Sequence, residues 1–330
     1  MPRVLSIQSH VVSGYVGNKA ATFPLQLLGF DVDAINTVQF SNHTGFNVWK
    51  GQRTDPASVL DLFEGLRLNG LDNYTHLLTG YMGNPESITV VRSIVDQLRA
   101  RHPHMCYVLD PVLGDDGHLY VPESMIGLYK RTLLPLAHLV TPNQFELERL
   151  TDTTVRTEAD LRRAVAHLHD LGVPNVVVTS CELEDRSAAT ADQGGRQLHL
   201  FGSQRIVTEK EGSTKDTLFR IDFPKLDGYF TGTGDLFCAL LLAHFTGHEA
   251  RVATPDESER LALACATALS TMAAVMRRTL DAQRAAGVEF QPDLPRSRRP
   301  AELVRHCELS LIRSKGDIES PELRYQAVHL

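Results

Sequence analysis

Asp235 directly follows Gly232-Thr233-Gly234 and begins a strongly apolar stretch of the chain. Glycines let the backbone turn tightly, so successive N–H groups can point the same way. A helix starting here adds unpaired N–H groups and the positive end of its dipole. The stretch therefore predicts an anion hole for phosphate oxygens, with Asp235 placed to accept a proton from an attacking hydroxyl. For these four residues alone, an ordinary acidic residue in a first helical turn is the simpler interpretation.

Two further carboxylates, Asp110 and Asp115, flank the bend Pro111-Val112-Leu113-Gly114. Magnesium ions prefer carboxylate and water oxygens and bridge them to phosphates, so both residues are candidate metal ligands. A turn-capping role explains Asp110 equally well. The spacing alone does not decide between these two interpretations.

Hydroxyl, amide and acidic side chains follow two later predicted strands. In Thr141-Pro142-Asn143-Gln144-Phe145-Glu146, Asn143 is a candidate phosphate contact and Glu146 a candidate for ordering metal-bound water. A glutamate in a first helical turn also complements the helix dipole, which is the favoured explanation of Glu146 by itself. Thr179 and Ser180 end a valine-rich strand, where their hydroxyls can meet a phosphate or cap the next segment.

The elements expected to position these residues alternate between strand and helix. Strands are predicted at residues 3–8, 31–38, 75–78, 105–109, 139–140 and 175–179. Helices are predicted at residues 19–28, 56–68, 86–101, 123–134 and 158–171, with another after Asn143. This alternation predicts a three-layer α/β fold, in which helices cover both faces of a mostly parallel sheet.

The region after residue 196 has a different pattern. Residues 197–201 and 204–208 are predicted to be antiparallel strands around a turn at Gly202-Ser203, and residues 218–223 another strand. Apolar helices are then expected as far as about Ala286, and an exposed Arg/Pro-rich loop over residues 281–302.

Polar residues follow the predicted strands at the edge where ligands bind in open parallel sheets. Together with Asp235, we expect the following residues to converge there: Ser9, Thr44, Tyr81, Asp110, Asp115, Thr141, Asn143, Glu146, Thr179 and Ser180. This convergence is a stronger argument for a site than any one motif.

Bulk properties narrow the class of protein. The chain has 330 residues, 42% of them hydrophobic, and we expect one domain spanning residues 1–330. A net charge of −7 disfavours a nucleic-acid partner. Five scattered cysteines without CxxC spacing predict neither disulfides nor a zinc site and favour the cytoplasm. No signal peptide or membrane span is predicted; residues 261–276 are expected to form a buried helix.

Two common phosphate-binding motifs are disfavoured by the sequence. A G-x-x-x-x-G-K-[ST] loop does not occur in it, and Phe237 takes the place of the third glycine of a GxGxxG motif. A P-loop NTPase and a Rossmann dehydrogenase are therefore both disfavoured.

Taken together, the motifs resemble those of the pyridoxal kinases, in the ribokinase-like superfamily. The resemblance is carried by Ser6-Ile7-Gln8-Ser9-His10, Gly14-Tyr15-Val16-Gly17-Asn18, Phe40-Ser41-Asn42-His43-Thr44-Gly45, Leu78-Thr79-Gly80-Tyr81, Asp110–Asp115, Thr141–Glu146 and Gly232–Asp235. Their order and spacing match over residues 3–281 and 303–327. The resemblance implies ATP-dependent phosphorylation of the 5′-hydroxymethyl group of pyridoxal, pyridoxine and pyridoxamine.

The resemblance also assigns a role to each site residue. Asp235 matches the catalytic base and a substrate contact. The vitamer site matches Ser9, Val38, Phe40, Thr44, Tyr81 and Gly232. The ATP site matches Asp110, Tyr120, Asn143, Glu146, Thr179, Ser180, Gly232, Thr233 and Gly234. The metal sites match Asp110, Asp115, Thr141, Glu146 and Thr179. Mg²⁺ with ATP, a monovalent cation (K⁺ or Na⁺) and a homodimer are implied as well.

The sequence departs from the family pattern in the flap, where only four residues separate Asp115 from Tyr120, and at Thr231, where an apolar residue is common. Two rival functions stay open. A hydroxymethylpyrimidine kinase shares the fold, but Ser9 with residues 40–45 favours a pyridine ring. A non-catalytic vitamin B6-binding protein would keep the pocket, but the intact Asp235 argues against it.

Overall fold

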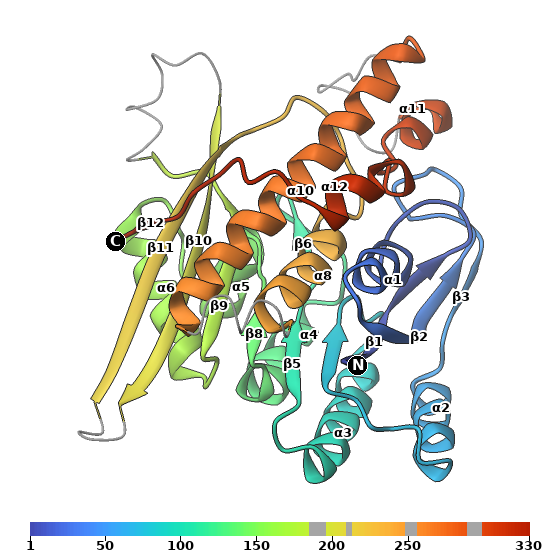
Figure 1. The fold of residues 1–330 in the computed structure, drawn as a ribbon. Helices are drawn as coiled ribbons and strands as arrows, with labels where there is room; N and C mark the ends of the chain where they lie inside the picture. Colours follow the sequence, from blue (N-terminus) through green and yellow to red (C-terminus); the bar gives the residue numbers. More distant parts are fainter. Residues whose placement is uncertain (185–195, 209–212, 248–255, 289–298) are drawn as a thin grey trace.

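The computed structural model describes residues 1–184, 196–208, 213–247, 256–288 and 299–330 (Figure 1). Its centre is one sheet with the strand order β12-β11-β10-β9-β8-β5-β4-β1-β2-β3. The parallel strands are β1 (Arg3–Val11), β2 (Asp31–Phe40), β4 (His76–Thr79), β5 (Cys106–Leu109), β8 (Leu139–Val140) and β9 (Asn175–Cys181). The predicted parallel sheet is therefore confirmed.

Antiparallel strands extend both edges of this sheet. Strand β3 (Gly51–Arg53) pairs with β2, and β10 (Gln197–Thr208), β11 (Ser213–Pro224) and β12 (Val328–His329) continue the sheet beyond β9. A separate hairpin, β6 (Gly114–Asp115) and β7 (His118–Leu119), stands outside the main sheet.

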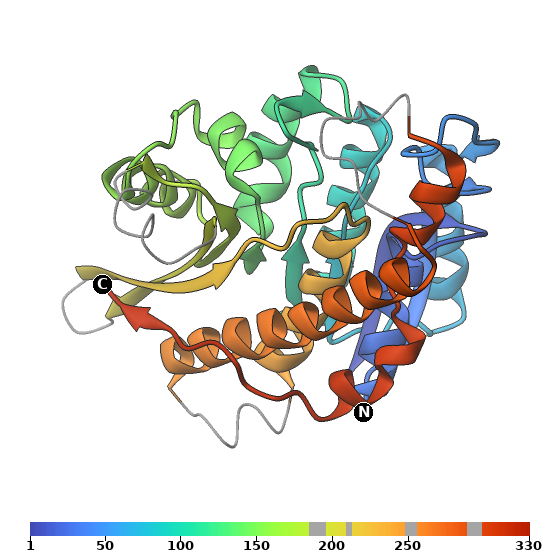
Figure 2. The ribbon, with the colours of Figure 1, turned by 90° about the horizontal axis from the view of Figure 1, so that it is seen from above.

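Helices pack on both faces of the sheet, which Figure 2 shows from above. One apolar core lies under α2 (Pro56–Leu68), α3 (Pro85–Arg101), α4 (Ser124–Leu128), α5 (Gln144–Thr151) and α6 (Glu158–Asp170). The other lies under α1 (Asn18–Leu27), α8 (Thr233–Thr246), α10 (Glu257–Ala285) and α12 (Lys315–Glu319). Shorter helical segments are η1 (Tyr129–Leu133), η2 (Leu134–Leu136), α11 (Ala301–His306) and η5 (Ile312–Ser314). The predicted three-layer architecture is confirmed.

The strands are apolar on both faces because both faces are covered. In β1, Leu5 and Ile7 point into the first core and Val4 into the second, as the two-residue repeat of a strand requires. Helix α8 is apolar on all sides for a related reason: every residue from Leu236 to Ala243 is buried between the sheet, α1 and α10. The start of α8 is therefore held firmly against the carboxyl ends of the strands.

The predicted turn at Gly202-Ser203 is wrong. Strand β10 runs without a break through both residues, and Gly202 pairs with Phe219 of β11. A Cβ on Gly202 would lie 2.0 Å from Cζ of Phe219, so the glycine makes room for the ring of its cross-strand neighbour. The helix predicted at residues 123–134 is also shorter, because α4 gives way to a π-helical turn and then to a 3-10 turn.

The C-terminal region differs in part from the predicted exposed loop. Helix α10 continues to Ala285, and Arg299 is only 8% exposed, with its guanidinium carbon 4.1 Å from the centre of the Tyr229 ring. The rest of the predicted loop, residues 289–298, lies outside the described residues.

Helix α10 accounts for the longest apolar run of the sequence. Helix α10 is long and apolar enough to cross a membrane by length and composition alone, but 61% of its most apolar stretch is buried inside the fold. Packing in the second core therefore explains its composition.

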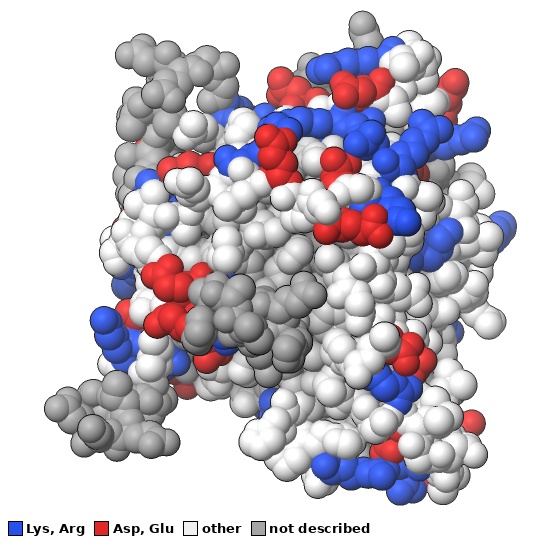
Figure 3. Space-filling view, viewed as in Figure 1, with Lys and Arg blue, Asp and Glu red and all other residues white. Residues whose placement is uncertain are grey.

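On the face drawn in Figure 3, described basic and acidic side chains lie next to one another.

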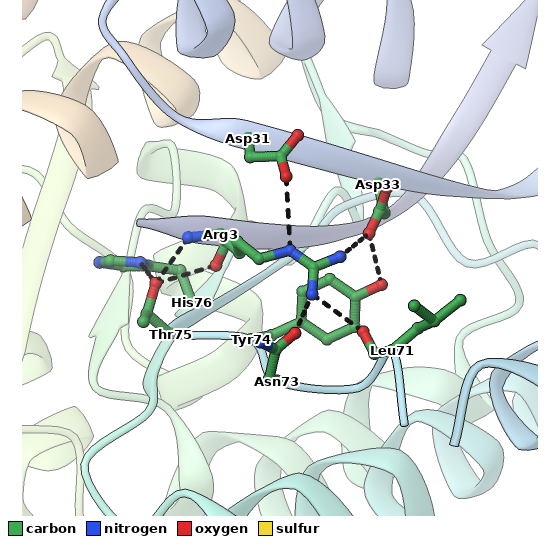
Figure 4. A network of polar contacts seen from close by, with 8 residues as sticks. All are labelled: Arg3, Asp31, Asp33, Leu71, Asn73, Tyr74, Thr75 and His76. Atoms are coloured by element: carbon green, nitrogen blue, oxygen red, sulfur yellow. Dashed lines mark hydrogen bonds and ion pairs between the residues drawn. The ribbon is translucent and has the colours of Figure 1, made fainter. Parts of the chain in front are cut away.

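A polar network ties the amino ends of β1 and β2 together, at the sheet edge opposite the carboxyl ends (Figure 4). The Arg3 guanidinium donates to Asp33 Oδ2 at 2.7 Å and to Asn73 Oδ1, and its Nε lies 3.4 Å from an oxygen of Asp31. The Tyr74 hydroxyl donates to the same Asp33 oxygen at 2.7 Å. One cation thus joins two strands and the segment that leads into β4.

Replacing Arg3 with alanine should lower the free energy of unfolding by about 1–3 kcal/mol, because it removes charge-assisted hydrogen bonds and leaves Asp33 without its cation. Urea unfolding measures the change, with Arg92→Ala as the control, since Arg92 forms an exposed ion pair with Asp96 on the surface of α3. Equal midpoints for the two variants would contradict the assigned role of the network.

Candidate active site

Helix α8 begins immediately after a left-handed residue, Gly232, whose φ is 77°. A Cβ at this position would lie 2.0 Å from the carbonyl oxygen of Tyr15, so only glycine fits. Gly232 also has no side chain to cap the first turn, which leaves the first N–H groups of α8 available to an anion. The predicted anion hole therefore has the backbone that it needs.

Asp235 lies half-buried in the first turn of α8. Its carboxylate accepts a hydrogen bond from the backbone N–H of Gly17. Burial raises the pKa of Asp235, and the bond from Gly17 opposes this shift. A carboxylate with a raised pKa is a better proton acceptor, as a general base requires.

Gly17 also packs closely against Ser9. Gly17 has a φ of 53°, and a Cβ on it would lie 2.1 Å from the carbonyl oxygen and 2.4 Å from the hydroxyl oxygen of Ser9. The end of β1 and the start of α8 therefore meet across this one glycine. Gly17 is not among the predicted site residues, although its place in a Gly-x-x-Gly turn is a signal that points to it.

Asp110 lies across the anion hole, where its Oδ2 is 3.8 Å from the position that a Cβ on Gly234 would take. It is 6% exposed. Burial, reinforced by the negative charges of Glu146 and Asp235, raises the pKa of Asp110 well above its usual range. The N–H of Val112 donates to Asp110 from a backbone with a φ of 40°, which is strained for a β-branched residue.

Glu146 and Asn143 form a capping box at the start of α5. Glu146 accepts from the N–H of Asn143 at 2.9 Å and from the N–H of Leu113 at 2.8 Å. The Asn143 amide in turn donates to the carbonyl of Gly114 at 2.8 Å. Burial raises the pKa of Glu146 to about 7. Both side chains therefore hold the bend after Asp110, in addition to any contact with a ligand.

The short flap is the tight hairpin β6–β7. Asp116 and Gly117, with φ angles of 49° and 78°, form its two-residue turn, as a type I′ turn requires. Asp115 stands exposed at the end of β6. Tyr120 follows the hairpin with 44% of its surface exposed, and its N–H donates to the carbonyl of Leu113.

The ends of β8 and β9 lie side by side near α8. The Thr141 hydroxyl is buried and donates to Sγ of Cys238 in α8 at 3.5 Å. The N–H of Thr179 donates to the carbonyl of Pro142 at 3.0 Å. Ser180 is half-buried next to Thr179. These hydrogen bonds bring Thr141 and Thr179 to the same part of the sheet edge.

Apolar side chains line the other side of the sheet edge. Val38 and Phe40 form a small cluster with Val11, and the partly buried Tyr81 packs against it. The ring of Trp49 lies 4.5 Å from that of Phe40, measured between centroids. Thr44 is exposed in the loop between them. The sequence analysis missed Trp49, although it is the single tryptophan of the chain.

The site carboxylates suit a metal ion that is bound together with phosphate oxygens and water. The described residues hold no group of three or more His, Cys, Asp and Glu side chains placed as metal ligands. Mg²⁺ typically uses one or two carboxylates together with phosphate oxygens and water. Asp110, buried among negative charges that raise its pKa, is a residue whose ionised form a divalent cation would stabilise.

The comparisons with known proteins agree with this geometry. The family model described as phosphomethylpyrimidine kinase matches residues 73–249, which places the chain among kinases of the ribokinase-like fold. This chain is 43% identical to human pyridoxal kinase over 99% of this chain and 98% of that protein. It is 44% identical to pyridoxal kinase of Arabidopsis thaliana over 98% of this chain and 94% of that protein. The chain belongs to the pyridoxal kinase family.

A solved structure extends this similarity to the whole fold. Pyridoxal kinase from Leishmania donovani in complex with ADP and pyridoxamine superposes with a TM-score of 0.82 and 34% sequence identity, covering 100% of both chains. The family resemblance and the fold predicted from the sequence are therefore confirmed.

Replacing Asp110 with asparagine should stabilise the ligand-free protein, and more at pH 8 than at pH 5.5. A buried carboxyl with a raised pKa binds more protons when folded than when unfolded, so the native state loses stability as pH rises between the two pKa values. Asparagine removes this charge and keeps an acceptor for Val112. Thermal unfolding without nucleotide or Mg²⁺ measures the effect.

The exposed Asp61 of α2 provides the control for this measurement, because Asp61→Asn should leave the midpoint unchanged at both pH values. A gain for Asp110→Asn that is the same at both pH values would show that buried charge is not its origin.

Proposed function

We propose that this protein is a pyridoxal kinase, which transfers the terminal phosphoryl group of ATP to the 5′-hydroxymethyl group of pyridoxal, pyridoxine and pyridoxamine. The observation that carries the proposal is the position of Asp235 at the uncapped start of α8, hydrogen-bonded to Gly17 and across Gly234 from Asp110. Full-length relatives named pyridoxal kinase support the choice of substrate.

In the proposed reaction, the vitamer hydroxyl points at Asp235, which takes its proton late in the transfer. Phosphoryl transfer has a loose transition state, so positioning and charge stabilisation matter more than a strong base. The N–H groups around Gly232, Thr233 and Gly234 stabilise charge on the moving phosphoryl group.

We assign the remaining residues to two sides of the site. On the vitamer side, Ser9 and Thr44 contact the ring substituents, and Val38, Phe40, Tyr81 and Gly232 form the walls. The nucleotide side is formed by Asp110, Tyr120, Asn143, Glu146, Thr179, Ser180 and Gly232–Gly234. The exposed position of Tyr120 beside the flap hairpin is compatible with a contact to bound nucleotide.

Two cations complete the proposal. Asp110 and Asp115 would hold Mg²⁺, which neutralises phosphate charge when it is bound with ATP. Glu146 is proposed to order metal-bound water, and Thr141 and Thr179 to serve a monovalent cation, K⁺ or Na⁺. The hydrogen bond between the N–H of Thr179 and the carbonyl of Pro142 keeps the two threonine-bearing strand ends close together, which supports this grouping.

The proposal includes a single domain, a homodimer and the cytoplasm as the place of action. One continuous sheet flanked by two cores supports the single domain. The five cysteines are unpaired and buried, which fits a reducing compartment.

Two rivals are separated from the proposal by one assay. A hydroxymethylpyrimidine kinase shares the matched family model, and a non-catalytic vitamin B6-binding protein would bind without turnover. ATP consumption is measured with pyridoxal, pyridoxine, pyridoxamine and hydroxymethylpyrimidine, each with and without K⁺. The highest kcat/KM for the first three alcohols supports the proposal, whereas preference for the pyrimidine or absence of turnover favours a rival.

Replacing Asp235 with alanine should lower kcat for pyridoxal by about 10²–10⁴-fold, the usual contribution of a general base. The KM for ATP should change little, because Asp235 is assigned to the hydroxyl side. Asp96→Ala on the exposed surface of α3 is the matched control. Near-normal turnover in Asp235→Ala would remove Asp235 from the mechanism.

A further inference from the structure

A carboxylate from the C-terminal part of the chain reaches two loops of the proposed vitamer side. Glu308, just after α11, accepts a hydrogen bond from the N–H of Tyr15 at its Oε2, at 2.9 Å. Its Oε1 lies 3.2 Å from Nε2 of His43. The two side chains are 14% and 9% exposed, respectively. Glu308 therefore joins the turn after β1 to the loop after β2, from a position 293 residues beyond Tyr15.

The hydrogen bonds around His43 fix its tautomer. Its Nδ1 lies 3.0 Å from the N–H of Gly45 and accepts from it, so in the neutral ring the proton is on Nε2. Nε2 lies 3.2 Å from Oε1 of Glu308, which is an ion-pair distance without the geometry of a hydrogen bond. A continuous chain of polar contacts thus runs from Gly45, the neighbour of Thr44, through His43 and Glu308 to Tyr15.

The same residue also meets the catalytic turn through its backbone. Glu308 forms an isolated parallel bridge with Thr231, the residue before Gly232. Gly232 in turn packs against the carbonyl of Tyr15. A Cβ on Gly14 would lie 2.3 Å from Oε1 of Glu308, so the turn after β1 is shaped to receive this carboxylate.

We propose that Glu308 is a positioning residue for the vitamer: it holds the His43–Thr44 loop and the Gly14–Gly17 turn in register with Asp235. The inference rests on the proposed function. A carboxylate suits this position because one oxygen accepts from the Tyr15 N–H and the other lies 3.2 Å from Nε2 of His43, a buried donor that makes no hydrogen bond within the described residues. A glutamine has one acceptor oxygen and turns its NH₂ toward the other donor.

The test compares Glu308→Gln with the wild type and with Glu302→Gln, which removes an exposed carboxylate from α11 in the same segment. We expect Glu308→Gln to raise the KM for pyridoxal by about 10- to 100-fold, the scale on which small misplacements act. The KM for ATP should stay within about twofold, and Glu302→Gln should match the wild type.

The single variant His43→Ala keeps the inference testable if Glu308→Gln folds poorly, and a double-mutant cycle applies if both single variants fold. His43→Ala breaks the same chain of contacts from the loop side, so it should raise the KM for pyridoxal in the same way. The KM for pyridoxal of the double variant Glu308→Gln/His43→Ala should be no higher than that of the single variant with the larger increase, because the two residues act as one unit.

The possible outcomes separate this inference from the proposed function. No turnover of pyridoxal by the wild type would overturn both. Normal wild-type turnover combined with an unchanged KM for pyridoxal in Glu308→Gln, or with fully additive effects in the cycle, would overturn the positioning role alone. A lower melting temperature with both KM values unchanged would show that Glu308 only anchors the C-terminal segment.

Discussion

The left-handed turn at Gly232 is the constraint on which the rest of the site depends. Its φ of 77° and its contact with the Tyr15 carbonyl leave no room for a side chain, so the chain enters α8 along one path. That path gives the first N–H groups of α8 to an anion and puts Asp235 against the N–H of Gly17. The buried, apolar body of α8 then holds this arrangement in place.

The second feature of the site is negative charge that the fold does not neutralise by itself. Burial raises the pKa values of Asp110, Glu146 and Asp235, and the negative charges of Glu146 and Asp235 raise that of Asp110 further. Such a cluster lowers the stability of the ligand-free protein at neutral pH. Backbone N–H groups donate to Glu146, and Val112 keeps a strained φ next to Asp110. The local backbone is therefore shaped to hold these carboxylates.

Much of the fold and of the phosphate side could be predicted from the sequence, because their signals are local. Strand–helix alternation and the glycines before Asp235 act over a few residues, and the structure places both as expected. The error at Gly202 has a non-local cause: the ring of Phe219, on the neighbouring strand, takes the space of a side chain. Cross-strand pairing with β11 therefore prevailed over a turn-like dipeptide.

The proposed phosphate and vitamer sides of the site also differ in whether local or distant parts of the chain form them. Phosphate oxygens are met by backbone groups at helix starts and strand ends, which short motifs specify wherever they occur. The loops after β1 and β2, which we assign to the vitamer, are held by contacts between distant parts of the chain: Glu308 to Tyr15 and His43, and the Asn47 amide to the carbonyl of Arg299. A loop with few buried apolar contacts gains order mainly from such anchors. If these loops bind the vitamer as we propose, their position relative to Asp235 is set in part by the C-terminal segment, outside the phosphate-binding motifs.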